Sequence, residues 1–346
     1  MCGHVLLARR VCDAGFMKAY TCRVCGNALY FENSVCVSCG AALGYSREER
    51  DIVPVDAGRY VDAAGLVWHV CRNLGLSGCT WLARLEGGQC AACDLTRVRP
   101  ADADAAGLAA FPVAERAKRH LVAELDALGF PVIGKAEDPV GGLAFDMLSS
   151  TSEQVMIAHA DGVVTIDLAE GVDSHRERVR EMLDEPYRTM LGHLRHEVGH
   201  YFEWRLVETV GGATLAQARA LFGDESADYQ ASVAQHYESG PPVDWPSRYI
   251  SAYATMHPYE DFAETWAHYL HISDTVETAV ATGLLPATDI IGYPSFSALV
   301  TDVWIPLSTA LNLVNRSMGA ADLYPFVLAE PVLAKLDFVA GLRPAG

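Results

Sequence analysis

The chain has 346 residues, and 51% of them are hydrophobic, which is enough for a sizeable core spread over two or three domains. Its formal net charge is −18, from 44 acidic and 26 basic residues, and this acidity argues against a surface that binds nucleic acid. No run approaches eighteen uninterrupted apolar residues, and the apolar run at the N-terminus is too short for a signal peptide, so we expect no membrane span.

A first cysteine cluster lies within residues 17–50. Cys22-x2-Cys25 is followed after ten residues by Cys36-x2-Cys39, and a glycine follows the second cysteine of each pair. Two such knuckles can bring four thiolates into a tetrahedron, as in a structural zinc ribbon, whereas the alternative is four reduced free thiols. Residues 1–16 precede this pattern and are expected to form an extra tail.

A second cluster lies within residues 60–100. It consists of Cys71-x7-Cys79 and, ten residues later, Cys90-x2-Cys93, so its first half is irregular for a zinc knuckle. We expect a second structural zinc ion here, again with free thiols as the alternative. Two sets of metal-spaced thiols favour zinc sites in a reducing compartment over a secreted disulfide framework, so we expect a cytoplasmic location.

Beyond the cysteines the pattern changes from loops to regular elements. Residues 100–107, rich in Ala and Asp, are predicted to be a linker, and residues 114–128 a helix that ends at Gly129. From Thr189 onward the sequence is predicted to be mostly helical. Together with a modest sheet before that helical half, these patterns predict an α+β fold.

A β-hairpin is predicted just before the helical half. Residues 155–160 and 163–168 are two β-rich runs around Asp161-Gly162, a dipeptide that favours a primed turn. An edge strand here, either 163–167 or its partner, is a candidate to pair with an extended peptide. An ordinary buried hairpin is the alternative.

The most informative motif is H-E-x-x-H at residues 196–200. It lies in a predicted long helix that starts near 184–186 and ends at 211–212. Four residues are about one helical turn, so the imidazoles of His196 and His200 project from one face and can bind one metal ion. Glu197 falls beside that ion and can act as a base on a metal-bound water. His193, one turn earlier, is a less favoured ligand.

A zinc hydrolase needs a third protein ligand, and two carboxylates downstream can provide it. Glu260 and Glu264 follow Pro258, which suits the first turn of a helix. They are one turn apart, so one can bind the metal while the other fixes the tautomer of a ligand histidine. The alternative is a solvated acidic helix start. His257 and Tyr259, beside Glu260, are expected to cap or pack.

H-E-x-x-H followed some sixty residues later by E-D-F-A-E resembles the glutamate-ligand zincins, the group that contains thermolysin and anthrax lethal factor. The resemblance implies a catalytic zinc ion with three protein ligands, namely His196, His200 and Glu260. It also implies Glu264 as the carboxylate that orients a ligand histidine and Glu197 as the general base. Tyr253 stands seven residues before Glu260, where lethal factor has a tyrosine that faces the reaction centre, and is a candidate oxyanion donor.

Longer runs resemble one narrower family, the zinc-binding metallopeptidases with an N-terminal zinc-ribbon region. The similarity lies in runs at 185–201, 222–229 and 315–326, and it covers most of the chain from about Met17. It implies four segments: a tail over 1–16, a zinc ribbon over 17–50, a second four-cysteine zinc module over 60–100 and a zincin-like metallopeptidase domain over 101–346. The segment between the two motifs carries Asp228-Tyr229 and His236-Tyr237, which are candidates to line the cleft.

The predicted activity is zinc-dependent hydrolysis of peptide or isopeptide bonds by a metal-activated water, with one catalytic and two structural zinc ions. The expected partner is a peptide or protein substrate, recognised in part through the zinc ribbons, with no nucleic acid and no membrane. Two alternatives stay open. One is a non-catalytic zinc-ribbon adaptor with a degenerate zincin domain, against which Glu197 and Glu260 argue. The other is a deconjugating amide hydrolase of narrow specificity.

Overall fold

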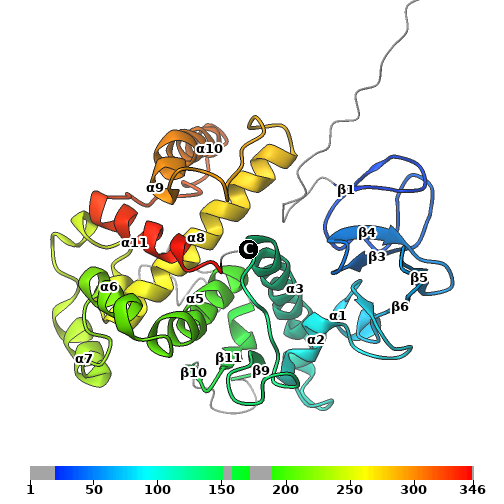
Figure 1. Cartoon of the computed structure of the whole chain (residues 1–346), viewed down its shortest axis with the longest axis horizontal. Helices are drawn as coiled ribbons and strands as arrows, with labels where there is room; N and C mark the ends of the chain where they lie inside the picture. The colour runs from blue at the N-terminus through cyan, green and yellow to red at the C-terminus, as the bar shows by residue number, and fades with distance from the viewer. Residues whose placement is uncertain (1–19, 151–157, 172–188, 345–346) are drawn as a thin grey trace, which may run out of the picture.

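The computed structural model describes residues 20–150, 158–171 and 189–344, and Figure 1 shows their arrangement. The first hundred residues form short strands joined by turns, whereas the rest of the described chain is mainly helical. In Figure 1 the β-rich part lies at one side of the molecule and most helices at the other, with helix α3 (Ala105–Leu128) between them. The predicted α+β fold is confirmed.

Three small antiparallel sheets organise the part that contains the cysteines. Their strands are β1 (Tyr20–Thr21) with β2 (Ala28–Leu29), β3 (Leu43–Ser46) with β4 (Asp51–Pro54), and β6 (Val67–Val70) between β5 (Arg59–Val61) and β7 (Leu82–Ala83). Two single-turn helices, α1 (Leu74–Ser77) and α2 (Ala91–Asp94), complete this part. Strands this short cannot bury a core alone, so their stability depends on the cysteine clusters and on packing against the helices.

Helix α3 is longer than the sequence predicted. It begins at Ala105 rather than near residue 114, because the Asp104 side chain accepts a backbone N–H of the first turn and caps the helix. It ends at Gly129, as predicted, in a left-handed conformation with φ 82°. The predicted linker over 100–107 is therefore wrong for its last three residues, since the aspartate that suggested a loop is an N-cap.

A four-stranded sheet precedes the helical half, with the strand order β10-β11-β9-β8. Its strands are β8 (Thr96–Val98), β9 (Ala144–Leu148), β10 (Ala158–Ala160) and β11 (Val163–Asp167). β10 and β11 form the predicted hairpin, and Asp161 and Gly162 have the positive φ values, 49° and 77°, that a type I′ turn requires. The part of the prediction over 155–157 lies outside the described residues.

The sheet order decides which strand can receive a peptide. β11 is hydrogen-bonded to β10 on one side and, in parallel, to β9 on the other. The prediction that 163–167 is an available edge is therefore wrong, because both of its ladders are occupied. Its partner β10 is the edge among the described strands on this side of the sheet.

Seven helices make up most of the described residues after 189. They are α5 (Met190–Glu203), α6 (Gly212–Phe222), α7 (Tyr229–Ser239), α8 (Pro258–Ala281), α9 (Phe296–Leu299), α10 (Ile305–Ser317) and α11 (Glu330–Gly341). Shorter turns of 3-10 or π helix accompany them: η1 (Leu168–Gly171), η2 (Trp204–Glu208), η3 (Trp245–Ser247), η4 (Tyr253–Thr255) and η5 (Val300–Trp304). Thr189 caps α5 through its hydroxyl, and the predicted helix start at 184–186 lies outside the described residues. Pro258 takes the first position of α8, as predicted.

Helices α5 and α8 approach each other closely at Gly199. A Cβ atom on Gly199 would stand 2.9 Å from Ala263 Cα and 3.2 Å from Trp266 Cβ, which is closer than ordinary contact. On the same helix Val198 and Phe202 are buried in the core, and the Phe202 ring stacks on that of Trp266 with 4.7 Å between centroids. The missing side chain at Gly199 thus sets the separation of the two helices that carry the motif residues.

One helical stretch has the length and apolarity of a membrane span. Within the described residues, the continuous run Phe296–Ser317, formed by α9, η5 and α10, has a mean hydropathy of 1.3. Phe296, Leu299 and Trp304 of this run are buried against the rest of the molecule, whereas only 28% of its most apolar window is buried in all. The length and hydropathy of one such run are not sufficient to assign a contact with a membrane.

Candidate metal centres

Three motif side chains converge from α5 and α8. His196 and His200 lie one turn apart on α5, and Glu260 lies in the first turn of α8. The Glu260 Oε2 atom is 3.0 Å from His196 Nε2 and 3.6 Å from His200 Nε2. One ligand atom from each residue lies within 4.8 Å of the others. The structure therefore brings together the three residues that the sequence assigned to one metal ion.

The chemistry of this donor set suits zinc. Tetrahedral donors about 2.0–2.1 Å from a zinc ion lie roughly 3.3 Å apart, and the two nitrogen–oxygen distances at Glu260, 3.0 and 3.6 Å, bracket this value. Burial lowers the pKa of His196, but the carboxylates of Glu260 and Glu264 outweigh burial and raise that pKa well above its ordinary value. The site therefore favours positive charge, which a divalent cation supplies.

Glu264 lies behind His196, one turn after Glu260 on α8. Its Oε1 atom is 2.8 Å from His196 Nδ1, and its Oε2 atom accepts a hydrogen bond from Ser251 Oγ at 2.7 Å. A carboxylate in this position keeps the proton on Nδ1, so that Nε2 can bind a metal. Ser251 was not predicted, because no local sequence pattern signals its contact with Glu264.

Both predicted catalytic residues lie beside the ligand histidines. Glu197 is buried on α5 between them, and its Oε1 atom is 3.6 Å from His193 Nε2. Tyr253 is in η4, and its ring centroid is 5.8 Å from that of His196. His193 thus neighbours the predicted base and is not part of the ligand group among the described residues.

The residues that flank Glu260 cap and pack, as expected. His257 Nδ1 accepts the backbone N–H of Tyr259 at 3.2 Å and caps α8. The Tyr259 hydroxyl donates to Glu208 at 2.8 Å. A contact that the sequence did not predict comes from α7, where Tyr229 donates its hydroxyl to Glu260 Oε1 at 2.8 Å. Its place on the segment between the two motifs had made Tyr229 one of four cleft candidates, with no partner assigned.

The first cysteine cluster has the geometry of two facing knuckles. Cys22 Sγ is 3.8 Å from Cys39 Sγ, and Cys25 Sγ is 3.6 Å from Cys36 Sγ. Four thiolates about 2.3 Å from a zinc ion lie roughly 3.8 Å apart, so the cluster fits a tetrahedral site. Two of its cysteines are buried, whereas Cys25 and Cys39 are exposed.

The second cysteine cluster is entirely buried, and the structure explains its irregular spacing. The segment between Cys71 and Cys79 contains helix α1, whose left-handed C-cap glycine leads the chain back to Cys79. Cys90 caps α2, and its Sγ atom is 3.6 Å from Cys79 Sγ. The four sulfur atoms, including that of Cys93, lie within 4.8 Å of one another. This cluster also fits a structural zinc ion.

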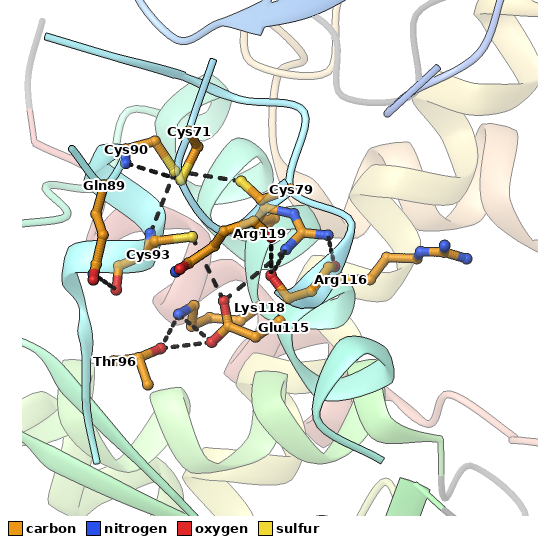
Figure 2. A network of polar contacts seen from close by, with 12 residues as sticks. Cys71, Cys79, Gln89, Cys90, Cys93, Thr96, Glu115, Arg116, Lys118 and Arg119 are labelled. Atoms are coloured by element: carbon orange, nitrogen blue, oxygen red, sulfur yellow. Dashed lines mark hydrogen bonds and ion pairs between the residues drawn. The ribbon is translucent and has the colours of Figure 1, made fainter. Parts of the chain in front are cut away.

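Charged side chains of α3 lie beside the second cluster, as Figure 2 shows. Glu115 Oε2 is 3.8 Å from Cys93 Sγ, and Glu115 Oε1 accepts a hydrogen bond from Lys118 Nζ at 2.6 Å. Arg119 forms an ion pair with Glu32, which belongs to the first ribbon. The side chains of Lys118 and Arg119 are fully buried. Each of these cations is paired with a carboxylate, Lys118 with Glu115 and Arg119 with Glu32, so the four side chains together carry no net formal charge beside the cluster.

A buried ion network joins α3, α5 and α8 next to the motif. Arg195 on α5 donates to Glu124 Oε2 at 2.9 Å and to Asp274 Oδ2 at 2.8 Å. His120 Nε2 is 3.0 Å from the same Asp274 oxygen, and the His120 ring lies 5.8 Å from the ring of Phe31 in the first ribbon. Burial raises the pKa of Asp274, but the charges of His120 and Arg195 outweigh it and lower that pKa to about 2. The network ties the motif helix to both neighbours and reaches the ribbon.

Comparisons with known proteins match both parts of the chain. Residues 107–342 match the family described as "Putative zinc-binding metallo-peptidase", and residues 19–104 match a zinc-ribbon domain. Curated relatives include uncharacterized proteins from Mycobacterium bovis and from two strains of Mycobacterium tuberculosis. Each is 48% identical over 330 residues, which cover 93% of this chain and 94% of the relative. No solved structure matches the chain.

Proposed function

Since this chain belongs to the family of zinc-binding metallopeptidases and has a zinc-ribbon domain at its N-terminus, we propose that it hydrolyses peptide bonds at a zinc centre of the glutamate-ligand type. The observation that carries the proposal is the convergence of two imidazoles and one carboxylate, with a buried glutamate beside them. The proposed zinc ligands are His196, His200 and Glu260. A zinc ion bound there supplies a Lewis acid that makes water nucleophilic near neutral pH.

The surrounding side chains have distinct proposed roles. Glu197 accepts the proton of the attacking water and passes it to the leaving amine, which is general acid–base catalysis. Tyr253, whose ring lies beside His196, donates a hydrogen bond to the carbonyl oxygen as that oxygen gains charge. Glu264 holds the His196 ring in the orientation that leaves Nε2 available. The same roles serve an ordinary peptide bond or an isopeptide bond.

The two cysteine clusters support a further part of the proposal. Each is suited to one structural zinc ion, which makes three zinc ions per chain with the hydrolytic one. Their thiols favour a reducing compartment, and this supports the proposal of a cytoplasmic location. The proposed substrate is a peptide or a protein, recognised in part by the ribbons.

The experiment that tests the proposal is the substitution Glu197→Gln. The wild-type protein should cleave members of a broad peptide library, and a chelator should abolish the cleavage until zinc is added back. The Glu197→Gln variant should bind the same amount of zinc and lose about 10²–10⁴-fold of the rate, since that is the usual contribution of a general base.

Two control variants make the outcome specific. Glu238→Gln removes a carboxylate from an exposed position on α7 and should leave the rate unchanged. His200→Ala should lose one zinc ion together with the activity. Full activity in Glu197→Gln would rule out Glu197 as the base, and cleavage that survives removal of all zinc would rule out the zinc mechanism.

A further inference from the structure

Tyr229 contacts the ligand carboxylate from outside both motifs. It stands at the start of α7 and donates its hydroxyl to Glu260 Oε1 at 2.8 Å. The other oxygen of this carboxylate, Oε2, faces the nitrogens of His196 and His200 at 3.0 and 3.6 Å. The two oxygens of Glu260 therefore have different partners: one faces the metal position and the other a phenol.

The backbone before Tyr229 is fixed by the cap of the helix that carries Glu260. His257 Nδ1 accepts the backbone N–H of Tyr259, so the ring proton is on Nε2, which donates to the carbonyl oxygen of Ala227 at 3.2 Å. The His257 ring also packs against the Tyr229 ring, with 5.2 Å between their centroids. One buried histidine thus aligns the phenol with the first turn of α8.

This arrangement stands out because α7 is otherwise a surface helix. None of its residues is buried. Near the site, α7 contacts other elements through the hydrogen bond from Tyr229 to Glu260. It also contacts η4, where Thr255 Oγ1 lies 3.4 Å from His236 Nδ1. A phenol on an exposed helix is usually solvated, so its bond to a buried carboxylate indicates a specific role.

We propose that Tyr229 is a positioning residue for the zinc ligand Glu260, an inference that rests on the proposed zinc centre. By engaging Oε1, the phenol leaves the metal a single carboxylate oxygen and opposes rotation of Glu260 to a bidentate mode. One oxygen and two imidazoles make three protein donors, which keeps a coordination position for water. Hydrogen-bond partners behind a metal ligand typically contribute 10–100-fold to metal affinity.

The test compares Tyr229→Phe with Tyr237→Phe in the full-length protein. The first variant removes the hydroxyl and keeps the ring on His257, so the fold should be retained. The second removes the hydroxyl of an exposed tyrosine, 65% accessible, on the same helix. Zinc affinity is measured by competition with a chelator, and the catalytic ion is identified as the one that His200→Ala lacks. Cobalt substitution at that site gives an absorption spectrum that reports the number of ligands.

The expected result is a 10–100-fold loss of zinc affinity in Tyr229→Phe, because this substitution removes the hydroxyl that hydrogen-bonds the metal ligand Glu260. The cobalt bands should also weaken, because a carboxylate that binds through both oxygens raises the coordination number. Tyr237→Phe should match the wild type in both measurements. Wild-type affinity and an unchanged spectrum in Tyr229→Phe would overturn the role of Tyr229 and leave the zinc centre intact. A wild-type protein that binds no more zinc than His200→Ala would instead overturn the zinc centre itself.

Discussion

The close approach of α5 and α8 makes Gly199 the most informative position for a single substitution. Gly199 lies inside the H-E-x-x-H motif, three residues after His196 and one before His200. In Gly199→Ala the added methyl group would meet the backbone of α8, at 2.9 Å from Ala263 Cα and 3.2 Å from the Ala263 carbonyl oxygen. These are backbone atoms, so no side-chain rotation can relieve the contact.

The size of the effect follows from these distances. Carbon atoms in contact prefer about 3.5–4.0 Å, so the two helices must separate by roughly 0.5–1 Å. Glu260 is one turn from Ala263, so this movement carries its carboxylate away from the imidazoles of α5. Metal–ligand distances tolerate only about 0.2 Å. Overpacking costs about 1–3 kcal/mol of stability, which exceeds the gain of about 0.5–1 kcal/mol expected for Gly→Ala in a helix.

The assay is urea unfolding together with zinc competition on Gly199→Ala. We expect a lower unfolding free energy and a catalytic zinc ion that is lost to a weaker chelator, while the zinc in the cysteine clusters is unaffected. Gly341→Ala, at the exposed end of α11 with open space around its Cβ, is the matched control and should be neutral or slightly stabilising. A Gly199→Ala variant as stable as the control and with wild-type zinc affinity would show that the close approach at Gly199 does not hold the site together.

Two further outcomes are expected from burial. Burial lowers the pKa of His268 to about 4 from 6.5, so the unfolded chain binds a proton that the folded protein excludes, and stability is lost as the pH falls from 6.5 towards 4. His268→Gln should reduce this loss by up to roughly 3 kcal/mol in urea titrations at matched zinc content; an identical pH slope would contradict this. With a chelator present, N-ethylmaleimide should modify the exposed Cys25 and Cys39 before the buried second cluster, as followed by peptide mass spectrometry, whereas equal rates would show that burial does not protect that cluster.

The parts of the site that were predictable lie within one helical turn or one tight turn of chain. The spacing of His196 and His200 places two imidazoles on one face of any helix, and Pro258 marks the start of the helix that carries Glu260. The primed turn at Asp161-Gly162 was predictable for the same reason, since its backbone angles follow from two adjacent residues.

Contacts between distant segments could not be predicted in this way. Both Glu260 and Glu264 satisfy the helical spacing, and the choice between them came from the resemblance to glutamate-ligand zincins. The structure distinguishes them because Glu260 faces Nε2 of both histidines, whereas Glu264 faces Nδ1 of His196. The contacts of Ser251 and Tyr229 with these carboxylates depend on how the residues before η4, and helix α7, pack on α8, and a single sequence carries no signal of that packing.

The ion pair between Arg119 and Glu32 limits how this protein can be divided. Arg119 lies within the metallopeptidase match, whereas Glu32 and the thiolates lie within the zinc-ribbon match. A cut at residue 105 would separate the Arg119 guanidinium from Glu32 and Ser77, leave it the 4.0 Å contact with Glu115, and expose it to solvent. The cut would also expose the apolar side chains that pack between the two parts, such as Phe31 against His120. Truncation at the family boundary should therefore destabilise the helical piece relative to the full chain, because the contacts of α3 with the ribbon part are lost.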